Sequence, residues 1–173
     1  MAMQLEAVRG DITKVDDVEA IVNAANESLL GGGGVDGAIH RAAGPRLLEE
    51  CRGLHGCRTG EAKITGAYDL PCEHVIHTVG PVWHGGGAGE PQLLEGAYRS
   101  SLEVAVENGI RRIAFPSIST GVYHYPVDQA AKIAVATVRA FDAAQPDALE
   151  LVRFVLFNDA AFEAYSEAIR AQD

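Results

Sequence analysis

Two asparagines, an aspartate and a histidine surround a run of glycines, and these are the residues best suited to chemistry in this chain. Asn23 and Asn26 precede four consecutive glycines at residues 31–34, and Asp36 and His40 follow them. Amides can hold hydroxyl groups, a carboxylate can take a proton from water, and the free N–H groups of a glycine loop can hold an anion. The spacing therefore indicates a site for a small anionic ligand beside a proton acceptor.

The glycine run lies between a strand-like segment that ends at Asn23 and a helical segment that begins near Val35. Four glycines cost backbone entropy on folding, which favours a loop that approaches a ligand closely over a merely flexible surface loop. Ligands of open α/β sheets bind at the carboxyl ends of strands, and the N–H groups at a helix start attract anions. We therefore expect phosphate to bind at this loop.

Asp36 and His40 are four residues apart and so share a face of the expected helix. A carboxylate in the first helical turn often only complements the helix dipole. Beside a bound diphosphate its charged form would be disfavoured, which would raise its pKa and make it a better base. For His40, support of the site and simple packing against the sheet both stay open.

A second glycine-containing turn spans residues 116–126, after a strand-like segment and before a helix. If both turns lie at the same edge of a sheet, they can close over one diphosphate from opposite sides. We expect Ser117, Ser119 and Thr120 to make hydrogen bonds within this turn rather than to act as nucleophiles, because no GxSxG elbow is present.

Gly32, Gly34 and Gly37 also match the GxGxxG pattern of dinucleotide-binding folds, which is a weak signal in isolation. In those folds the glycines follow the strand almost directly, whereas residues 24–30 intervene here. The sequence also has no acidic residue at the end of a second strand at the distance that a ribose contact needs. A nicotinamide-binding protein is therefore the more distant alternative.

Strand-like and helical segments alternate along the chain. Runs rich in Val and Ile predict strands at residues 5–9, 20–24, 64–68, 74–79, 112–116 and 151–157. Apolar residues at helical spacing predict helices over residues 35–51, 92–108 and 126–141, and after residue 158. This alternation predicts an α/β fold whose sheet is covered on both faces.

Length and composition fit one soluble domain over residues 1–173, with 47% hydrophobic and 22% charged residues. The net charge of −10 argues against an extended nucleic-acid groove, which needs clustered Lys and Arg. The sequence shows neither a signal peptide nor a membrane-spanning run, so we expect a cytoplasmic protein without a membrane partner.

The three cysteines, Cys51, Cys57 and Cys72, are odd in number and have no CxxC spacing. We expect buried free thiols in a reducing compartment rather than disulfides. The histidines show no metal-ligand spacing with these cysteines, so we expect neither a metal nor another cofactor; the four considered are His55, His74, His77 and His84.

Several motifs in order resemble the macrodomain family and, more narrowly, its MacroD-type branch of ADP-ribosyl hydrolases. They are GDIT at residues 10–13, IVNAAN at 21–26, LLGGGGVDGAIHRAAG at 29–44, TGEAKIT at 59–65, VIHTVGP at 75–81 and ISTGVY at 118–123. The similarity extends from residue 10 to residue 157. It implies a three-layer α/β/α sandwich with a mixed central sheet of about six to seven strands and helices on both faces.

The resemblance also implies which residues bind ADP-ribose. Asp11 and the Ile12 backbone would contact adenine, and Phe157 would stack on it. Asn23 and Asn26 would face the distal ribose. The residues around the diphosphate would be Gly33, Gly34 and Val35 on one side and Ser119, Thr120, Gly121, Val122 and Tyr123 on the other, with Tyr123 also bordering the distal ribose.

The catalytic residues implied by the resemblance are Asp36, as the carboxylate that activates water, with Asn26 and His40 in support. Two positions depart from the family pattern. The family usually has glycine at the position of His124, and the position of Asn158 is often acidic. The roles of these two residues stay open from sequence.

The sequence offers one convincing catalytic carboxylate, whereas cleavage of a glycosidic bond normally uses two. A carboxylate leaving group is weakly basic and can depart without a general acid. The site therefore favours esters, meaning O-acetyl-ADP-ribose and mono-ADP-ribosylated Asp or Glu residues of proteins, as the resemblance also implies. A reader module that binds ADP-ribose without catalysis remains the alternative.

Overall fold

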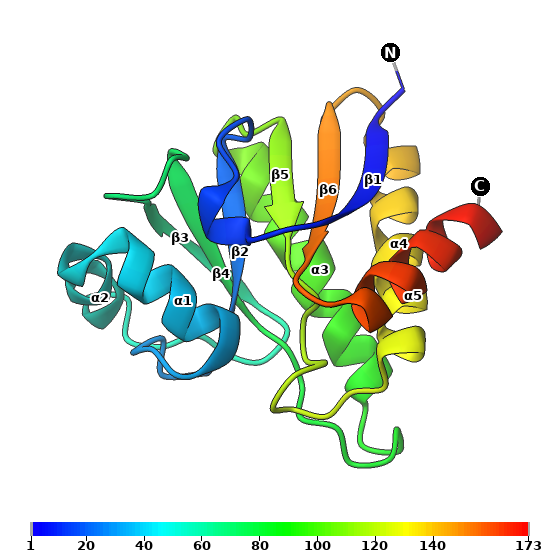
Figure 1. The fold of residues 1–173 in the computed structure, drawn as a ribbon, viewed down its shortest axis with the longest axis horizontal. Helices are drawn as coiled ribbons and strands as arrows, with labels where there is room; N and C mark the ends of the chain where they lie inside the picture. Colours follow the sequence, from blue (N-terminus) through cyan, green and yellow to red (C-terminus); the bar gives the residue numbers. More distant parts are fainter. Residues whose placement is uncertain (1, 173) are drawn as a thin grey trace.

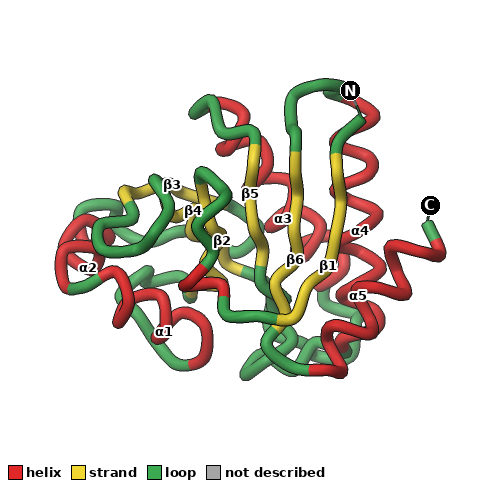
Figure 2. The backbone as a smooth tube through the Cα atoms, turned by 45° about the horizontal axis from the view of Figure 1, so that its top comes forward, coloured by secondary structure: helices red, strands yellow, loops and turns green. Residues whose placement is uncertain are grey.

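A computed structural model describes residues 2–172 of the chain. Its centre is a six-stranded sheet with the strand order β1-β6-β5-β2-β4-β3, drawn in Figures 1 and 2. The strands are β1 (Gln4–Arg9), β2 (Ala20–Ala25), β3 (Ala62–Gly66), β4 (His74–Val79), β5 (Arg112–Phe115) and β6 (Leu151–Leu156). Neighbouring strands are parallel except for β3, which pairs antiparallel with β4. The carboxyl ends of the other five strands therefore share one edge.

Helices cover both faces of this sheet (Figure 1). One face carries the short 3-10 helix η1 (Ile12–Lys14) with α1 (Gly34–Ala43) and α2 (Pro45–Arg52). The opposite face carries α3 (Glu90–Glu107), α4 (Val127–Ala144) and α5 (Asp159–Ala171). The arrangement is a three-layer α/β/α sandwich with a mixed sheet, which confirms the predicted fold class.

The central strand β2 shows how the sequence divides between the two layers. Ala20 and Val22 belong to the apolar cluster with α3, α4 and α5, whereas Ile21 and Ala25 belong to the cluster with α1 and α2. Successive side chains of a strand point to opposite faces, so a strand buried on both faces reads as a continuous apolar run. Asn23 is the buried polar residue within this run.

The single helix predicted over residues 35–51 is wrong, because the chain forms two helices there. Gly44 has a φ of 88°, in the left-handed region, and its N–H donates to the carbonyl of His40 at 3.1 Å. Pro45 then opens α2, where its missing N–H is tolerated. The apolar positions continue across the break through Leu47 and Cys51, which explains why periodicity alone did not reveal it.

The thiols are free, as the sequence predicts. Cys51 and Cys57 are buried, whereas Cys72 is half-buried. Burial raises the pKa of the Cys51 thiol to about 11, so this group stays protonated near neutral pH. None of the helices within residues 2–172 is long and apolar enough to cross a membrane.

Candidate functional site

The residues expected to form the site lie along the carboxyl edge of the parallel strands. Asp11 follows β1, Phe157 follows β6, the turn at residues 116–126 follows β5, and Asn26 follows β2. The strands occur in this same order across the sheet. Strands are about 4.8 Å apart, so the three steps from β1 to β2 cover roughly 14 Å. These segments therefore line one continuous edge.

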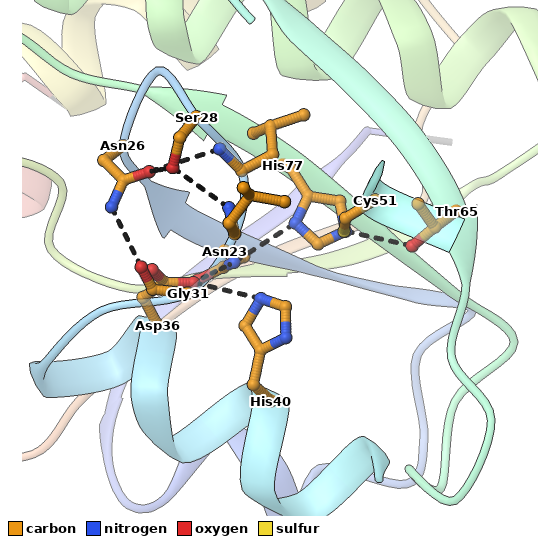
Figure 3. A network of polar contacts seen from close by, with 11 residues as sticks. Asn23, Asn26, Ser28, Gly31, Asp36, His40, Cys51, Thr65 and His77 are labelled. Carbon is orange, nitrogen blue, oxygen red and sulfur yellow. Dashed lines mark hydrogen bonds and ion pairs between the residues drawn. The ribbon is translucent and has the colours of Figure 1, made fainter. Parts of the chain in front are cut away.

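Asp36 lies in the first turn of α1 and is buried (Figure 3). Its Oδ1 accepts a hydrogen bond of 2.8 Å from Nδ2 of Asn23, and Nε2 of His40 lies 3.4 Å from the same oxygen. Burial raises the pKa of Asp36 above its ordinary value, although the Asn23 hydrogen bond and a positive charge on His40 act to lower it. The carboxylate is therefore a better proton acceptor than an exposed aspartate.

Asn23 connects Asp36 to polar residues on two further strands (Figure 3). The register of β2 and β4 pairs Asn23 with His77, and Nδ2 of Asn23 lies 3.1 Å from Nδ1 of His77. Nε2 of His77 lies 2.9 Å from Oγ1 of Thr65 on β3. Burial, followed by a positive charge on His40, lowers the pKa of His77 to about 3, so its imidazole is neutral at neutral pH.

Neither His77 nor Thr65 is among the site residues expected from the sequence. His77 is 54 positions from Asn23, and only the pairing of β2 with β4 brings the two together. A signal is nevertheless present, since VIHTV is an apolar strand with a histidine at its centre. A buried polar side chain in such a strand requires a hydrogen-bond partner.

Asn26 closes the loop that leads into the glycines. Its Nδ2 donates to the carbonyl of Gly31 at 3.0 Å. Its Oδ1 accepts hydrogen bonds from the Ser28 hydroxyl at 2.6 Å and from the N–H of Leu29 at 3.2 Å. The amide therefore fixes the shape of the loop, and one of its two Nδ2 hydrogens remains for a ligand.

The glycine loop lies close against the start of α1. A Cβ on Gly37 would meet the carbonyl oxygen of Gly32 at 2.5 Å, and a Cβ on Gly32 would come within 3.2 Å of Asp36 Oδ2. Gly34 has a φ of 59°, which favours glycine. Gly33 caps α1 without a side chain, so the first N–H groups of the helix stay open to an anion.

The second turn confirms the expected hydroxyl hydrogen bonds for Ser117 and Thr120 and extends them into the core, but the expectation is wrong for Ser119. Ser117 Oγ lies 2.6 Å from Thr120 Oγ1 and 2.9 Å from the hydroxyl of Tyr165 on α5, which in turn lies 3.0 Å from the hydroxyl of Tyr98 on α3. Ser119 differs: its φ is 68°, and its buried Oγ has no hydrogen-bond partner among residues 2–172. The tyrosines of α5 and α3 therefore fix the turn through Ser117, whereas the Ser119 hydroxyl stays available to a ligand.

The remaining turn residues, Gly121, Val122 and Tyr123, are exposed or half-buried. Tyr123 is half-buried, and burial together with the negative charges of Glu27 and Asp36 raises the pKa of its hydroxyl. Gly121 is exposed beside it, and Val122 is 77% exposed. Because β5 and β2 are parallel neighbours in the sheet, the turn after β5 and the loop after β2 begin side by side at this edge.

At the far end of the edge, Asp11 and Phe157 follow the paired strands β1 and β6. Asp11 Oδ1 accepts hydrogen bonds from the hydroxyl and the N–H of Thr13, at 2.6 and 3.0 Å, and the hydroxyl bond is the main reason that its pKa is lowered. Ile12 beside it is buried, while Phe157 is 79% exposed. An exposed aromatic ring and a carboxylate at the ends of two paired strands can hold a flat, hydrogen-bonding ligand between them.

The two departures from the family pattern have local structural explanations. His124 has a φ of 63°, in the left-handed region that favours glycine, and its N–H donates to the carbonyl of Gly121 at 3.0 Å. Asn158 caps α5, because its Oδ1 accepts from the N–H of Ala161 at 2.8 Å. Asparagine is among the preferred residues at such a position.

Known proteins match this chain over most of its length. The family model of the Macro domain matches residues 22–134, well over half of the chain. The chain belongs to the macrodomain family. A macro domain-containing protein of Chlorobaculum tepidum is 60% identical, with 96% of each chain covered. A protein of Klebsiella pneumoniae named O-acetyl-ADP-ribose deacetylase is 56% identical, with 95% of each chain covered.

Solved macrodomain structures show the same fold. The Trypanosoma brucei macrodomain in complex with ADP-ribose is 44% identical and superposes with a TM-score of 0.91, covering 96% of this chain and 69% of that chain. The Oceanobacillus iheyensis macrodomain with ADP is 45% identical with a TM-score of 0.90, covering 96% and 90%. The strand order of this macrodomain also differs from that of dinucleotide-binding folds, so the glycine spacing does not mark one.

Proposed function

We propose that this macrodomain binds ADP-ribose and hydrolyses its esters, namely O-acetyl-ADP-ribose and mono-ADP-ribosylated Asp or Glu side chains of proteins. The observation that carries the proposal is the buried Asp36, which lies beside the glycine loop and is held by Asn23. The deacetylase name of the Klebsiella pneumoniae relative and the ADP-ribose complex of the Trypanosoma brucei macrodomain support it. In this proposal residues 1–173 act as one macrodomain of the MacroD type.

The proposed ligand lies along the carboxyl edge of the sheet in the order of the strands. Adenine lies between Asp11 and Phe157 at the β1 and β6 end, with the Ile12 backbone at its edge. The distal ribose lies at Asn23 and Asn26 after β2. The diphosphate lies between the two loops, which contribute Gly33, Gly34 and Val35 on one side and Ser119, Thr120, Gly121, Val122 and Tyr123 on the other.

In the proposed reaction Asp36 orients a water molecule and takes one of its protons. For a protein ester, the water oxygen bonds to the anomeric carbon of the distal ribose, the bond from that carbon to the ester oxygen breaks, and the Asp or Glu carboxylate leaves. For the acetyl ester, water attacks the acyl carbon, and the proton held by Asp36 passes to the departing ribose oxygen. Much of the rate enhancement comes from positioning, because the loops fix the diphosphate relative to the carboxylate.

His40 has a defined place in this proposal. Its Nε2 lies 3.4 Å from Asp36 Oδ1, a distance that supports the carboxylate electrostatically. The same nitrogen is buried and has no well-formed hydrogen bond within residues 2–172. We therefore propose that His40 supports Asp36 and contacts the distal ribose or the attacking water through this nitrogen.

Substitution of Asp36 tests the proposal. We expect Asp36→Ala to slow single-turnover release of ADP-ribose from glutamate-modified protein by about a hundredfold or more, because the variant lacks the group that takes the proton. Calorimetry should show a much smaller change in ADP-ribose affinity. Glu103→Gln is the matched control, since this exposed carboxylate lies on α3 at the opposite face of the sheet.

The alternative function, a reader without catalysis, makes a different prediction for the unaltered protein. A reader would bind ADP-ribose but would release none from a glutamate-linked substrate in a single turnover. Unchanged turnover in Asp36→Ala would instead rule out Asp36 as the base.

Comparing a glutamate-linked with a serine-linked substrate tests the preference for esters, since a serine alkoxide is a poor leaving group without a general acid.

A further inference from the structure

A network of three buried polar residues lies behind the proposed catalytic carboxylate, and two of them, Thr65 and His77, have no role in the mechanism above. Thr65 on β3, His77 on β4 and Asn23 on β2 are each 2% exposed or less. They connect in sequence across three neighbouring strands and end at Asp36 (Figure 3). Buried polar networks of this kind restrict side chains to one arrangement when every member is paired.

The hydrogen of the Thr65 hydroxyl determines the direction of the whole network. This hydroxyl has one hydrogen, and it donates to the carbonyl of Gly66 at 2.9 Å. With that hydrogen on a backbone carbonyl, Thr65 Oγ1 accepts from His77 Nε2, 2.9 Å away, and Cys51 Sγ, 3.8 Å from the same nitrogen, can accept as well. Nε2 consequently carries the proton of the neutral ring, and Nδ1 is left as an acceptor.

The tautomer of His77 in turn determines the orientation of the Asn23 amide. An acceptor at Nδ1 requires a donor opposite, and the amide nitrogen of Asn23 lies there at 3.1 Å. The second hydrogen of the same nitrogen goes to Asp36 Oδ1 at 2.8 Å. In the reversed orientation, Oδ1 of Asn23 would face the Nδ1 lone pair and the carboxylate, which are both acceptors.

One atom of this three-residue network has no hydrogen-bond partner among residues 2–172. Oδ1 of Asn23 is fully buried and accepts no hydrogen bond from residues 2–172. A buried acceptor without a partner costs free energy, which a ligand hydroxyl or a water molecule would recover. Asn26 lies on the Asp36 side of the glycine loop, since a Cβ on Gly32 would meet both Asn26 Nδ2 at 3.4 Å and Asp36 Oδ2 at 3.2 Å. Within residues 2–172 it keeps one unused amide hydrogen, so the two asparagines offer one acceptor and one donor, as a hydroxyl group requires.

We propose that His77, oriented by Thr65, is a positioning residue that holds the Asn23 amide in one orientation, so that Nδ2 fixes Asp36 and Oδ1 accepts from the distal ribose hydroxyl or the attacking water. The inference rests on the proposed function, because it assigns this ligand chemistry to the same site. Fixing the amide matters for the reaction, since a reversed amide would place an acceptor against the catalytic carboxylate.

The first test measures the tautomer directly in the unaltered protein. The ¹⁵N chemical shifts of the His77 ring are expected to show a protonated Nε2 and an unprotonated Nδ1 at pH 7. Assignment by comparison with His77→Asn keeps the signal distinct from those of the other histidines. A protonated Nδ1 would overturn the proposal, whatever the activity of the protein.

The second test compares two substitutions of the buried His77, one without and one with a hydrogen-bond acceptor near the position of Nδ1. His77→Phe removes the acceptor, and we expect single-turnover hydrolysis of glutamate-linked ADP-ribose to slow by about tenfold to a hundredfold, with a smaller loss of ADP-ribose affinity. His77→Asn places an amide oxygen near the position of Nδ1, so most of the lost rate should return. Thr65→Val, which removes the hydroxyl that sets the tautomer together with its hydrogen bond to the carbonyl of Gly66, should show an intermediate loss.

Thermal unfolding of each variant separates positioning from folding. If His77→Phe does not fold, the ¹⁵N shifts and the Thr65→Val rate still decide the question. Equal rates and affinities in unaltered protein and His77→Phe would overturn the proposal, as would a His77→Asn variant no better than His77→Phe. If the unaltered protein hydrolyses no ester, the proposed function fails. The positioning role of His77 is then tested by the tautomer and by the affinity for ADP-ribose. That affinity should fall from unaltered protein through His77→Asn to His77→Phe.

Discussion

Asn26 has one amide hydrogen left after it has closed the loop that carries the glycines. Its Oδ1 accepts from Ser28 and Leu29, and its Nδ2 donates to the carbonyl of Gly31. The sequence suggested a ribose contact and support of the catalytic carboxylate for this residue. In the structure Asn26 also fixes the loop, so the loop conformation and the proposed ligand contact depend on the same amide.

Replacing Asn26 by aspartate tests this double role. Asn26→Asp keeps an acceptor for Leu29 but places a carboxylate oxygen against the carbonyl of Gly31, where a donor was. We expect ADP-ribose affinity to fall by about tenfold or more, and by more than in Asn26→Ala, which removes both interactions without adding repulsion. Calorimetry measures the affinities. An aspartate variant that binds as tightly as the unaltered protein would contradict this account of the loop.

At the scale of elements, Glu90 connects the start of α3 to the site through the loop before it. Its buried carboxylate accepts hydrogen bonds from the N–H groups of His84 at 2.7 Å, Gly86 at 3.0 Å and Ala88 at 2.7 Å. Trp83 precedes this loop, and its N–H donates to the carbonyl of Tyr123 at 2.8 Å. Glu90 therefore fixes a loop that contacts the turn after β5.

The Glu90 carboxylate predicts a dependence of stability on acid pH. Burial acts to raise its pKa, but the hydrogen bonds from backbone N–H groups outweigh burial and lower the pKa to about 2, from an ordinary value of 4.5. A group with a lowered folded pKa contributes stability that is fully present above its unfolded pKa and is lost as the pH falls toward its folded pKa. The contribution of Glu90 should therefore be constant above pH 4.5 and decrease between pH 4.5 and about 2.

Urea unfolding of unaltered protein and Glu90→Gln measures this contribution. The glutamine variant should have a lower free energy of unfolding at pH 7, and the difference between the two proteins should shrink as the pH falls from 4.5 to about 2. Glu95→Gln, on an exposed face of α3, serves as the control with little change. A difference for Glu90 that stays constant over this range would show that its charge does not hold the loop.

At the scale of the whole molecule, the net charge of −10 repels the proposed anionic ligand. The proposed diphosphate site has backbone N–H groups rather than lysines, so local hydrogen bonds act against a long-range repulsion. Salt screens the long-range part most, because the Debye length falls from about 30 Å at 0.01 M to about 8 Å at 0.15 M ionic strength. Local hydrogen bonds change little over the same range.

Association of ADP-ribose should therefore become faster as salt is added. We expect the association rate constant to rise severalfold between about 0.01 and 0.15 M ionic strength, with a smaller change in the dissociation rate constant. Stopped-flow measurements give both, and adenosine provides an uncharged control whose association should not depend on salt. An association rate that falls with salt would indicate a basic binding surface instead.

Much of the fold followed from local patterns. Strand-like runs, most of them rich in Val and Ile, predicted every strand of the sheet, although β3 spans Ala62–Gly66 rather than residues 64–68. Turn chemistry located the glycine loop and the start of α1 with Asp36 on it, because glycine and proline signals act over a few residues. The Gly44–Pro45 break was the exception, since the apolar periodicity continued across it.

The sequence by itself determined the alternation of strands and helices, the loops at the strand ends and the residue types on them, because periodicity and turn preferences are local. Only the tertiary structure decided that His77 and Thr65 lie behind Asn23. That contact depends on the strand order β2-β4-β3, which is set by how the two apolar clusters pack on the sheet rather than by any neighbouring residue. The orientation of the Asn23 amide, and with it the support of Asp36, follows from this pairing.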